Sequence, residues 1–190
     1  ISRQFGSMGR SIAKELSTIL GIEFMDRDIV EATAKRMGLP VSVISDEEES
    51  MKSNFFRRQY PLGMGMSSLK DEIFYTQKNI IRDFAAKGSC IIVGRCADYI
   101  LEDIPKHLNV YIYAPNEARL KNCVENLQMD PQTAKKMMRD VDAARNRYHK
   151  AYIPGWQSVF DHKDLMIDSS RFGIDGTAKI LADIVKNQWG

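Results

Sequence analysis

Apolar residues recur at two different spacings along this chain, and the alternation predicts helices interleaved with strands. Ile12, Leu16, Ile19 and Leu20 fall on one face of a helix that Gly21 ends. The same spacing predicts helices over 28–37, 71–87, 97–101, 116–127, 131–148 and 174–188. Short continuous apolar runs, typical of strands buried on both faces, predict strands over 22–25, 90–93, 108–113 and 165–167. This order predicts an α/β fold with a parallel sheet of about five strands and helices on both faces.

One stretch of the chain lacks a sustained apolar period. Residues 41–70 contain four consecutive acids at 46–49 and a Pro-Leu-Gly-Met-Gly run at 61–65. Such a stretch predicts an insertion with short helices rather than a layer of the core. We expect one domain, 1–190, that contains this insertion. We also expect the chain to start inside its protein, because the first loop needs a strand before it and only Ile1 is left of that strand.

Composition narrows the class of protein without naming a function. Hydrophobic residues make up 44% and charged residues 27% of the chain, which excludes disordered, collagen-like and disulfide-scaffold proteins. No apolar run approaches the roughly 20 residues of a membrane-spanning helix, and no signal peptide is visible. Three cysteines without a CxxC pair indicate reduced thiols and a cytoplasmic protein. The net charge of +2 is too small to indicate a nucleic acid or a membrane as partner.

A glycine-rich loop directly before the first predicted helix is the first chemical clue. The phosphate-binding pattern GxxxxGK[ST] lies between a strand and a helix, where backbone N–H groups and the helix N-terminus surround a phosphate. This loop follows the pattern with two changes, because Gln4 replaces the first glycine and Arg10 replaces the lysine, while Ser11 keeps the hydroxyl that would bind Mg²⁺. The predicted phosphate-binding residues are Gly6, Ser7, Met8, Gly9, Arg10 and Ser11. The alternative is a glycine turn that opens an ordinary helix.

Two further candidates follow predicted strands. Asp26 and Asp28 come after the strand at 22–25, and Arg95 follows Gly94 at the end of the strand at 90–93. Ligands of open α/β sheets bind at the carboxyl ends of the strands, so Asp26 and Arg95 are candidates to line a cleft. The planar guanidinium of Arg95 suits a phosphate, or else a structural ion pair. Asp28 is predicted to cap the helix that follows it.

The helix over 131–148 carries an excess of positive charge. Residues 135–150 hold six Lys or Arg and two Asp. Arg139, Asp142 and Arg145 follow one another at three-residue steps, so they project from one broad side of the helix. Phosphoryl transfer needs such cations, and a helix of this kind can act as a lid. A solvated helix face is the alternative.

Together these segments resemble the cytidylate kinase-like proteins of bacteria, within the nucleoside monophosphate kinases. The matching pieces are Ser-Arg-Gln-Phe-Gly-Ser-Met-Gly-Arg at 2–10, Phe-Met-Asp-Arg-Asp at 24–28, Ile-Ile-Val-Gly-Arg-Cys-Ala-Asp at 91–98, Asp142-x-x-Arg145, and Ile-Asp-Ser-Ser-Arg-Phe-Gly-Ile at 167–174. The resemblance implies a P-loop kinase fold with an acceptor-binding insertion at 41–70 and a lid region at 130–160. It implies transfer of a phosphoryl group from ATP to a nucleoside monophosphate, CMP or dCMP.

The resemblance also implies a set of site residues and partners. ATP and Mg²⁺ would bind at 6–11, with Ser11 on the metal and Ser169 to Arg171 near the adenine. The catalytic residues would be Arg10, Arg139 and Arg145, and the acceptor-binding residues would be Asp26, Arg95 and Asp142. We expect nucleotide substrates as partners, no nucleic acid or membrane, and a monomer or weak homodimer.

Two other functions remain open on the residues alone. The Phe24-x-Asp26-x-Asp28 segment is also similar to the acceptor motif of shikimate-type kinases, which phosphorylate a small hydroxylated metabolite. The replacements at Gln4 and Arg10 also fit a non-catalytic domain that binds a nucleotide as a sensor.

Overall fold

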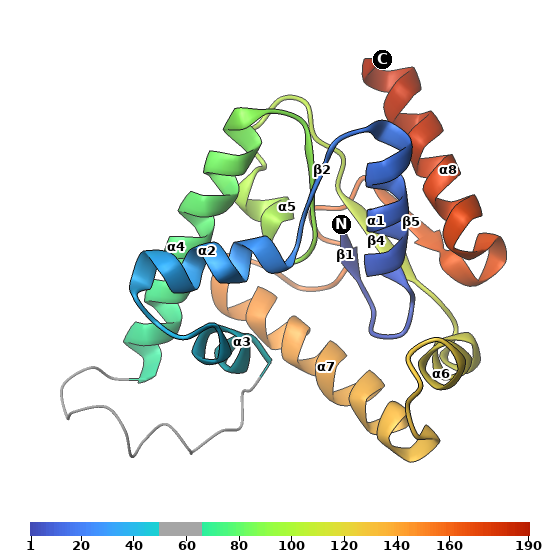
Figure 1. The fold of residues 1–190 in the computed structure, drawn as a ribbon, viewed down its shortest axis with the longest axis horizontal. Helices are drawn as coiled ribbons and strands as arrows, with labels where there is room; N and C mark the ends of the chain where they lie inside the picture. Colours follow the sequence, from blue (N-terminus) through green and yellow to red (C-terminus); the bar gives the residue numbers. More distant parts are fainter. Residues whose placement is uncertain (50–65) are drawn as a thin grey trace. The chain divides into compact units, whose positions relative to one another are not determined.

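The computed structural model describes residues 1–49 and 66–190, with the backbone alone described at 46–49 and 66–68. Contacts divide the chain into two compact units, whose helices and strands carry the labels of Figure 1. Unit 1 comprises residues 1–24 and 89–190, and unit 2 comprises residues 25–88.

Unit 1 is built on parallel strands. β1 (Ser2–Arg3), β4 (Val110–Tyr113) and β5 (Leu165–Asp168) pair in the order β1-β4-β5, with Ser2 opposite Tyr111 and Val110 opposite Leu165. The nitrogen of Ile1 donates to the Ile92 carbonyl at 2.7 Å, and the Gly94 N–H donates to the Ile1 carbonyl at 3.0 Å. This alternation is the hydrogen-bonding pattern of a parallel ladder, so it continues the sheet to β3 (Cys90–Ile92), with which β2 (Glu23–Met25) pairs.

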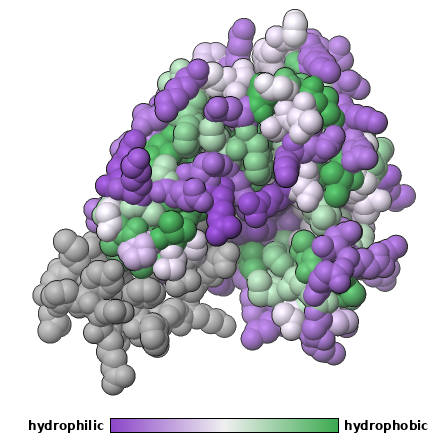
Figure 2. Space-filling view, in the orientation of Figure 1, coloured by the Kyte–Doolittle hydropathy of each residue, from purple (hydrophilic) through white to green (hydrophobic). Residues whose placement is uncertain are grey.

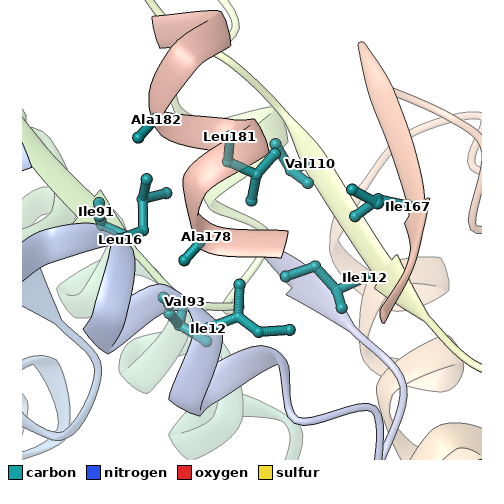
Figure 3. Packing of buried hydrophobic residues seen from close by; sticks show 11 residues of the cluster. Ile12, Leu16, Ile91, Val93, Val110, Ile112, Ile167, Ala178, Leu181 and Ala182 are labelled. Carbon is teal, nitrogen blue, oxygen red and sulfur yellow. The ribbon is translucent and has the colours of Figure 1, made fainter. Parts of the chain in front are cut away.

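Two helices form the core of unit 1 with these strands. α1 (Gly9–Leu20) packs against α8 (Ser169–Trp189), and both cover the apolar side chains of the strands. Figure 3 shows these side chains converging, and the fully buried ones include Ile12 of α1, Ile112 of β4 and Leu181 of α8. The helical face predicted for residues 12–20 is therefore confirmed as a core face, and Gly21 follows the helix in a left-handed conformation, as predicted.

Three more helices belong to unit 1: α5 (Ala97–Ile100), α6 (Asn116–Glu125) and α7 (Pro131–Tyr152). α6 and α7 pack against each other. The Asp130 carboxylate accepts a hydrogen bond from the Thr133 N–H at 2.9 Å, and Pro131 occupies the first turn, so the predicted start of α7 is confirmed.

α8 begins one turn earlier than the apolar spacing predicted. Asp168 caps its first turn by accepting from the Ser170 N–H at 2.9 Å. At Gly173 the backbone leaves the helical region, with φ 66° and ψ −171°, and a second helical stretch then continues to Trp189. The first turn of α8, before Gly173, contributes no residue to the apolar face of the helix. The apolar spacing in the sequence therefore could not predict this turn.

The described part of unit 2 contains three helices and, at Met25, the end of β2. α2 (Arg27–Met37) packs against α3 (Val41–Glu49) and α4 (Met66–Lys87). Their shared core consists of Val30, Ala34, Ile44 and Ile73. The predicted insertion at 41–70 thus contains α3 and the start of α4, and its residues 50–65 lie outside the described part.

Hydrophilic and hydrophobic side chains alternate over the face drawn in Figure 2, where green patches are separated by purple ones. Among residues 1–49 and 66–190, no helix combines the length and the apolar character needed to cross a bilayer.

Candidate functional site

The glycine loop, residues 4–8, connects β1 to α1 and contains two left-handed residues. Gly6 has φ 78° and Met8 has φ 60°, and the helix starts at the next residue. Successive N–H groups in such a turn point toward one side and form a concave donor surface. The first N–H groups of α1 have no partner inside their own helix, so they extend the same donor surface. The two left-handed residues and the helix start thus lie where the sequence pattern placed the loop, and its binding of phosphate stays a prediction.

Close packing requires glycine at two positions. A Cβ at Gly6 would lie 2.9 Å from both the Arg119 carbonyl oxygen and the Cys123 sulfur. A Cβ at Gly9 would lie 2.7 Å from the Arg3 Cβ. Any larger residue at either position would push the loop away from α6 or from β1.

Serine hydroxyls tie the glycine loop to the sheet. Ser7 Oγ lies 2.9 Å from the Gln4 carbonyl and 3.1 Å from the Ile112 carbonyl, and its single O–H donates to one of them at a time. Ser169 Oγ, at the start of α8, lies 2.8 Å from the Ser7 carbonyl and 3.1 Å from the Tyr113 carbonyl. Gln4 also has a defined role, because its Oε1 accepts from the Ala114 N–H at 3.2 Å. The residue that replaces the first glycine of the pattern thus fastens the loop to the end of β4.

Arg119 is a buried cation that holds the loop from α6. Only 6% of this residue is exposed. Its Nη1 donates to the Phe5 carbonyl at 3.1 Å and to Asp142 Oδ2 at 2.5 Å, and its Nη2 donates to Asn116 Oδ1 at 3.0 Å. From the next turn of α6, Asn122 Nδ2 donates to the Gly6 carbonyl at 2.9 Å. Sequence reasoning missed both residues, and their three-residue spacing on α6 was the only signal.

α7 brings one of its three predicted residues to the glycine loop and a second to the adjoining strand β1. Asp142 Oδ1 accepts from the Phe5 N–H at 2.8 Å, and Arg145 Nη1 donates to the Arg3 carbonyl at 3.0 Å. Arg145 Nη1 also lies 3.8 Å from Asp142 Oδ1. Arg139 is different, because its side chain is 75% exposed and pairs with Asp140 at 3.2 Å. The predicted shared side of Arg139, Asp142 and Arg145 is thus divided, because Asp142 bonds to the loop and Arg145 to β1, while Arg139 is exposed.

Burial shifts the pKa values of two groups near Arg119 and Asp142. Burial, with a contribution from the Asp142 carboxylate, raises the pKa of Tyr111 to about 12. Burial also raises the pKa of the Cys123 thiol against the loop. Both groups therefore stay neutral at physiological pH. The three cysteines are free, as predicted.

Arg10 and Ser11 lie in the first turn of α1. The Arg10 side chain is exposed and Ser11 is half-buried. Their place at the head of the helix is the one that the phosphate-binding pattern gives to its lysine and its hydroxyl residue. Their roles toward phosphate and Mg²⁺ stay predictions. Among the described residues, no group of three or more His, Cys, Asp or Glu is arranged to hold a metal ion.

The predicted acceptor residues lie in both units. Asp26 in unit 2 is 7% exposed and precedes α2, without a side-chain hydrogen bond to the helix end. Asp28 lies inside the first turn of α2, so its predicted capping role is wrong, because the helix starts at Arg27. In unit 1, Arg95 follows β3 with φ 57°, and its Nη1 donates to the Val93 carbonyl at 3.2 Å.

Comparison with known families decides the class of this chain. Residues 1–171 match the cytidylate kinase-like family. The chain belongs to this family. The resemblance inferred from the sequence motifs is therefore confirmed over nearly the whole chain.

One curated relative and two solved structures are similar to this chain. A cytidylate kinase of Methanocaldococcus jannaschii is 26% identical over 108 residues, which cover 55% of this chain and 60% of that protein. The alignment thus spans less than two thirds of the relative's length. An uncharacterized protein from Eubacterium ventriosum has a TM-score of 0.73 at 24% identity, with 97% of this chain and 95% of that chain covered. Shikimate kinase from Acinetobacter baumannii, solved with shikimate, has a TM-score of 0.54 at 15% identity, with 100% and 93% covered. These likenesses confirm the predicted α/β fold with a parallel sheet.

Proposed function

We propose that this cytidylate kinase-like chain transfers the γ-phosphoryl group of ATP to a nucleoside monophosphate, CMP or dCMP. The observation that carries the proposal is the path of the glycine loop. Two left-handed residues, Gly6 and Met8, lead the chain from β1 to the head of α1, where Arg10 and Ser11 stand. Donor-rich loops at helix N-termini are suited to phosphate groups. Family membership supports the same reaction class.

The loop fits ATP and Mg²⁺ by its shape and its donors. At Gly6 and Gly9 the backbone packs so closely against α6 and β1 that a Cβ would collide with their atoms, so the loop lies directly against both elements. Backbone N–H groups of residues 6–11 and the Arg10 guanidinium would hold phosphate oxygens, and the Ser11 hydroxyl would hold Mg²⁺. The metal ion, when bound, neutralises charge on the phosphates.

In this proposal the remaining site residues bind the acceptor and stabilise charge. Asp26 and Arg95 would bind the acceptor, and the planar guanidinium of Arg95 suits its phosphate. Arg139 and Arg145 would approach the transferring group when α7 closes as a lid. The acceptor is already a phosphate, so catalysis needs positioning and neutralisation of charge rather than a strong base.

Two other functions have specific observations in their favour. Asp26 is buried at the start of α2, which suits a carboxylate that holds a substrate hydroxyl, as in a small-metabolite kinase of the shikimate type. Arg10 in the place of the lysine favours a nucleotide-binding sensor without turnover.

One assay distinguishes the three functions. ADP release is measured with a coupled assay in the presence of CMP, dCMP, UMP, AMP, shikimate or no acceptor. We expect the largest rate with CMP or dCMP, and a strong loss of that rate in Ser11→Ala but not in Ser17→Ala, a matched change farther along α1. ADP release that occurs with shikimate but with none of the nucleotides would support the metabolite kinase. Binding of ATP without release under any condition would support the sensor.

A further inference from the structure

The two carboxylate oxygens of Asp142 hold different partners in the structure. Oδ1 accepts from the Phe5 N–H at 2.8 Å, and Oδ2 accepts from Arg119 Nη1 at 2.5 Å. The Asp142 side chain is 23% exposed and that of Arg119 is 7% exposed. A charge-assisted pair in such a shielded place is stronger than one in water.

The partners of Asp142 hold the same short piece of backbone. Arg119 donates to the Phe5 carbonyl at 3.1 Å, and Arg145 donates to the Arg3 carbonyl at 3.0 Å. The backbone on both sides of Gln4 is therefore fixed by side chains of α6 and α7. The glycine loop also makes an apolar contact with α6 and α7, because Phe5 packs against the core formed by Cys123, Ala134 and Met138.

This arrangement differs from the acceptor-binding role that the sequence suggested for Asp142. Oδ1 bonds to the Phe5 N–H of the glycine loop, and Oδ2 bonds to Arg119 of α6, which itself donates to the Phe5 carbonyl. Through Arg119 it also reaches α6, whose Asn122 bonds to the Gly6 carbonyl. A shift of this carboxylate would move the first half of the glycine loop and leave the acceptor residues in place.

We propose that Asp142 is a positioning residue for the glycine loop, acting through Phe5 and Arg119 to set the ATP side of the site and to couple α7 to it. This inference rests on the proposed ATP-dependent function. Misplacement of a reacting group by about 1 Å can cost on the order of 10²-fold in rate. The effect of losing Asp142 should therefore fall on ATP kinetics.

The kinetic test compares Asp142→Asn and Asp142→Ala with a matched control. Asparagine keeps an oxygen for the Phe5 N–H but loses the charge that Arg119 needs, whereas alanine loses both. We expect kcat/KM for ATP to fall on the order of 10²-fold in Asp142→Ala and less in Asp142→Asn, with the KM for the acceptor unchanged. Glu125→Gln, an exposed acid on α6, should behave as the wild type. Adding Arg119→Gln to Asp142→Asn should cost little more, because both charges are then absent.

A second measurement needs no activity. Amide hydrogen exchange of the native protein, followed by NMR, should show Phe5 protected in the wild type and in Glu125→Gln, and faster in Asp142→Ala. If the wild type neither binds ATP nor releases ADP, the proposed function fails, while the exchange at Phe5 still tests the positioning role. Rapid exchange of Phe5 in the wild type would overturn the inference even if neither Asp142 variant folds. An Asp142→Asn variant that raises only the acceptor KM would overturn it as well and assign Asp142 to the acceptor.

Discussion

Lys163 and Asp98 form an ion pair in which both side chains are buried. The side chains are 3% and 4% exposed, and Lys163 also donates to the Asp161 carbonyl at 2.8 Å. The pair connects the segment between α7 and β5 to α5, two parts of unit 1 that are far apart in the sequence. A buried charge requires its partner, because neither group can be solvated by water.

Removal of one partner of this pair should destabilise the fold strongly. In Lys163→Met the Asp98 carboxylate stays buried without its cation, and such variants lose about 3–5 kcal/mol of unfolding free energy. The double variant Lys163→Met, Asp98→Asn should recover part of that loss, because no uncompensated charge remains. Urea unfolding at pH 7 of both single variants and the double variant measures the coupling. Additive losses would mean that the two charges do not interact.

Substitution of Arg10 tests whether the glycine loop supports phosphoryl transfer with arginine in the place of lysine. In Arg10→Lys the forked guanidinium is replaced by a point charge, so we expect kcat to fall about tenfold, as for the loss of one charge-assisted hydrogen bond. The measurement is the steady-state rate with CMP at saturating ATP. Lys14→Arg, the opposite exchange one turn later on exposed α1 surface, should leave the rate unchanged. A rate gain in Arg10→Lys would instead show that arginine impairs a loop built for lysine.

The arginines of α7 should differ in their effects on turnover. Arg145→Ala and Arg139→Ala are expected to lower kcat on the order of 10³-fold if both guanidinium groups meet the transferring phosphate. Arg147→Ala, an exposed arginine on the same helix, should keep a near-wild-type kcat. Steady-state kinetics with ATP and CMP decide between these outcomes. Arg139 specifically tests whether α7 closes as a lid, because its side chain is exposed in the structure while Arg145 already bonds to β1. An unchanged kcat in Arg139→Ala alone would show that α7 does not bring this residue to the phosphates.

His149 should make stability depend on pH. Burial is the main cause that lowers its pKa below the ordinary 6.5, and its Nδ1 lies 2.8 Å from the Arg145 carbonyl, to which it donates. Above pH 6.5 the ring is neutral in both the folded and the unfolded chain, so it contributes nothing. Below pH 6.5 His149 becomes protonated in the unfolded chain but stays neutral in the folded chain. The free energy of unfolding therefore falls by up to about 1.4 kcal/mol per pH unit.

Urea unfolding from pH 8 to pH 5 measures this effect. His149→Gln should flatten the fall below pH 6.5. The same slope in wild type and His149→Gln would assign the proton uptake to other groups.

Local features of the chain were predictable because their causes lie within a few residues. Asp130 and Pro131 start α7 through a cap and a fixed backbone angle, and Gly21 ends α1 because it adopts a left-handed conformation without strain. The core face of α1 follows from the helical period alone. The glycine loop was equally visible, since the strand, the glycines and the helix start are contiguous. The sequence pattern and the family it resembles thus located the candidate ATP site.

Only the tertiary structure decided which side chains hold that loop. Ser169 bonds to a loop carbonyl 162 residues away, Asp142 to an N–H 137 residues away, and Arg119 to a carbonyl 114 residues away. Such pairs depend on the order of the strands, which brings the starts of α1 and α8 to one edge of the sheet. For Arg119 the sequence offered only its three-residue spacing from Asn122, because arginine is mostly exposed unless it is paired, and its partner Asp142 lies on another helix. Residue order on a helix placed Asp142 and Arg145 on one side, but the packing of α7 on α6 determined that this side faces the glycine loop.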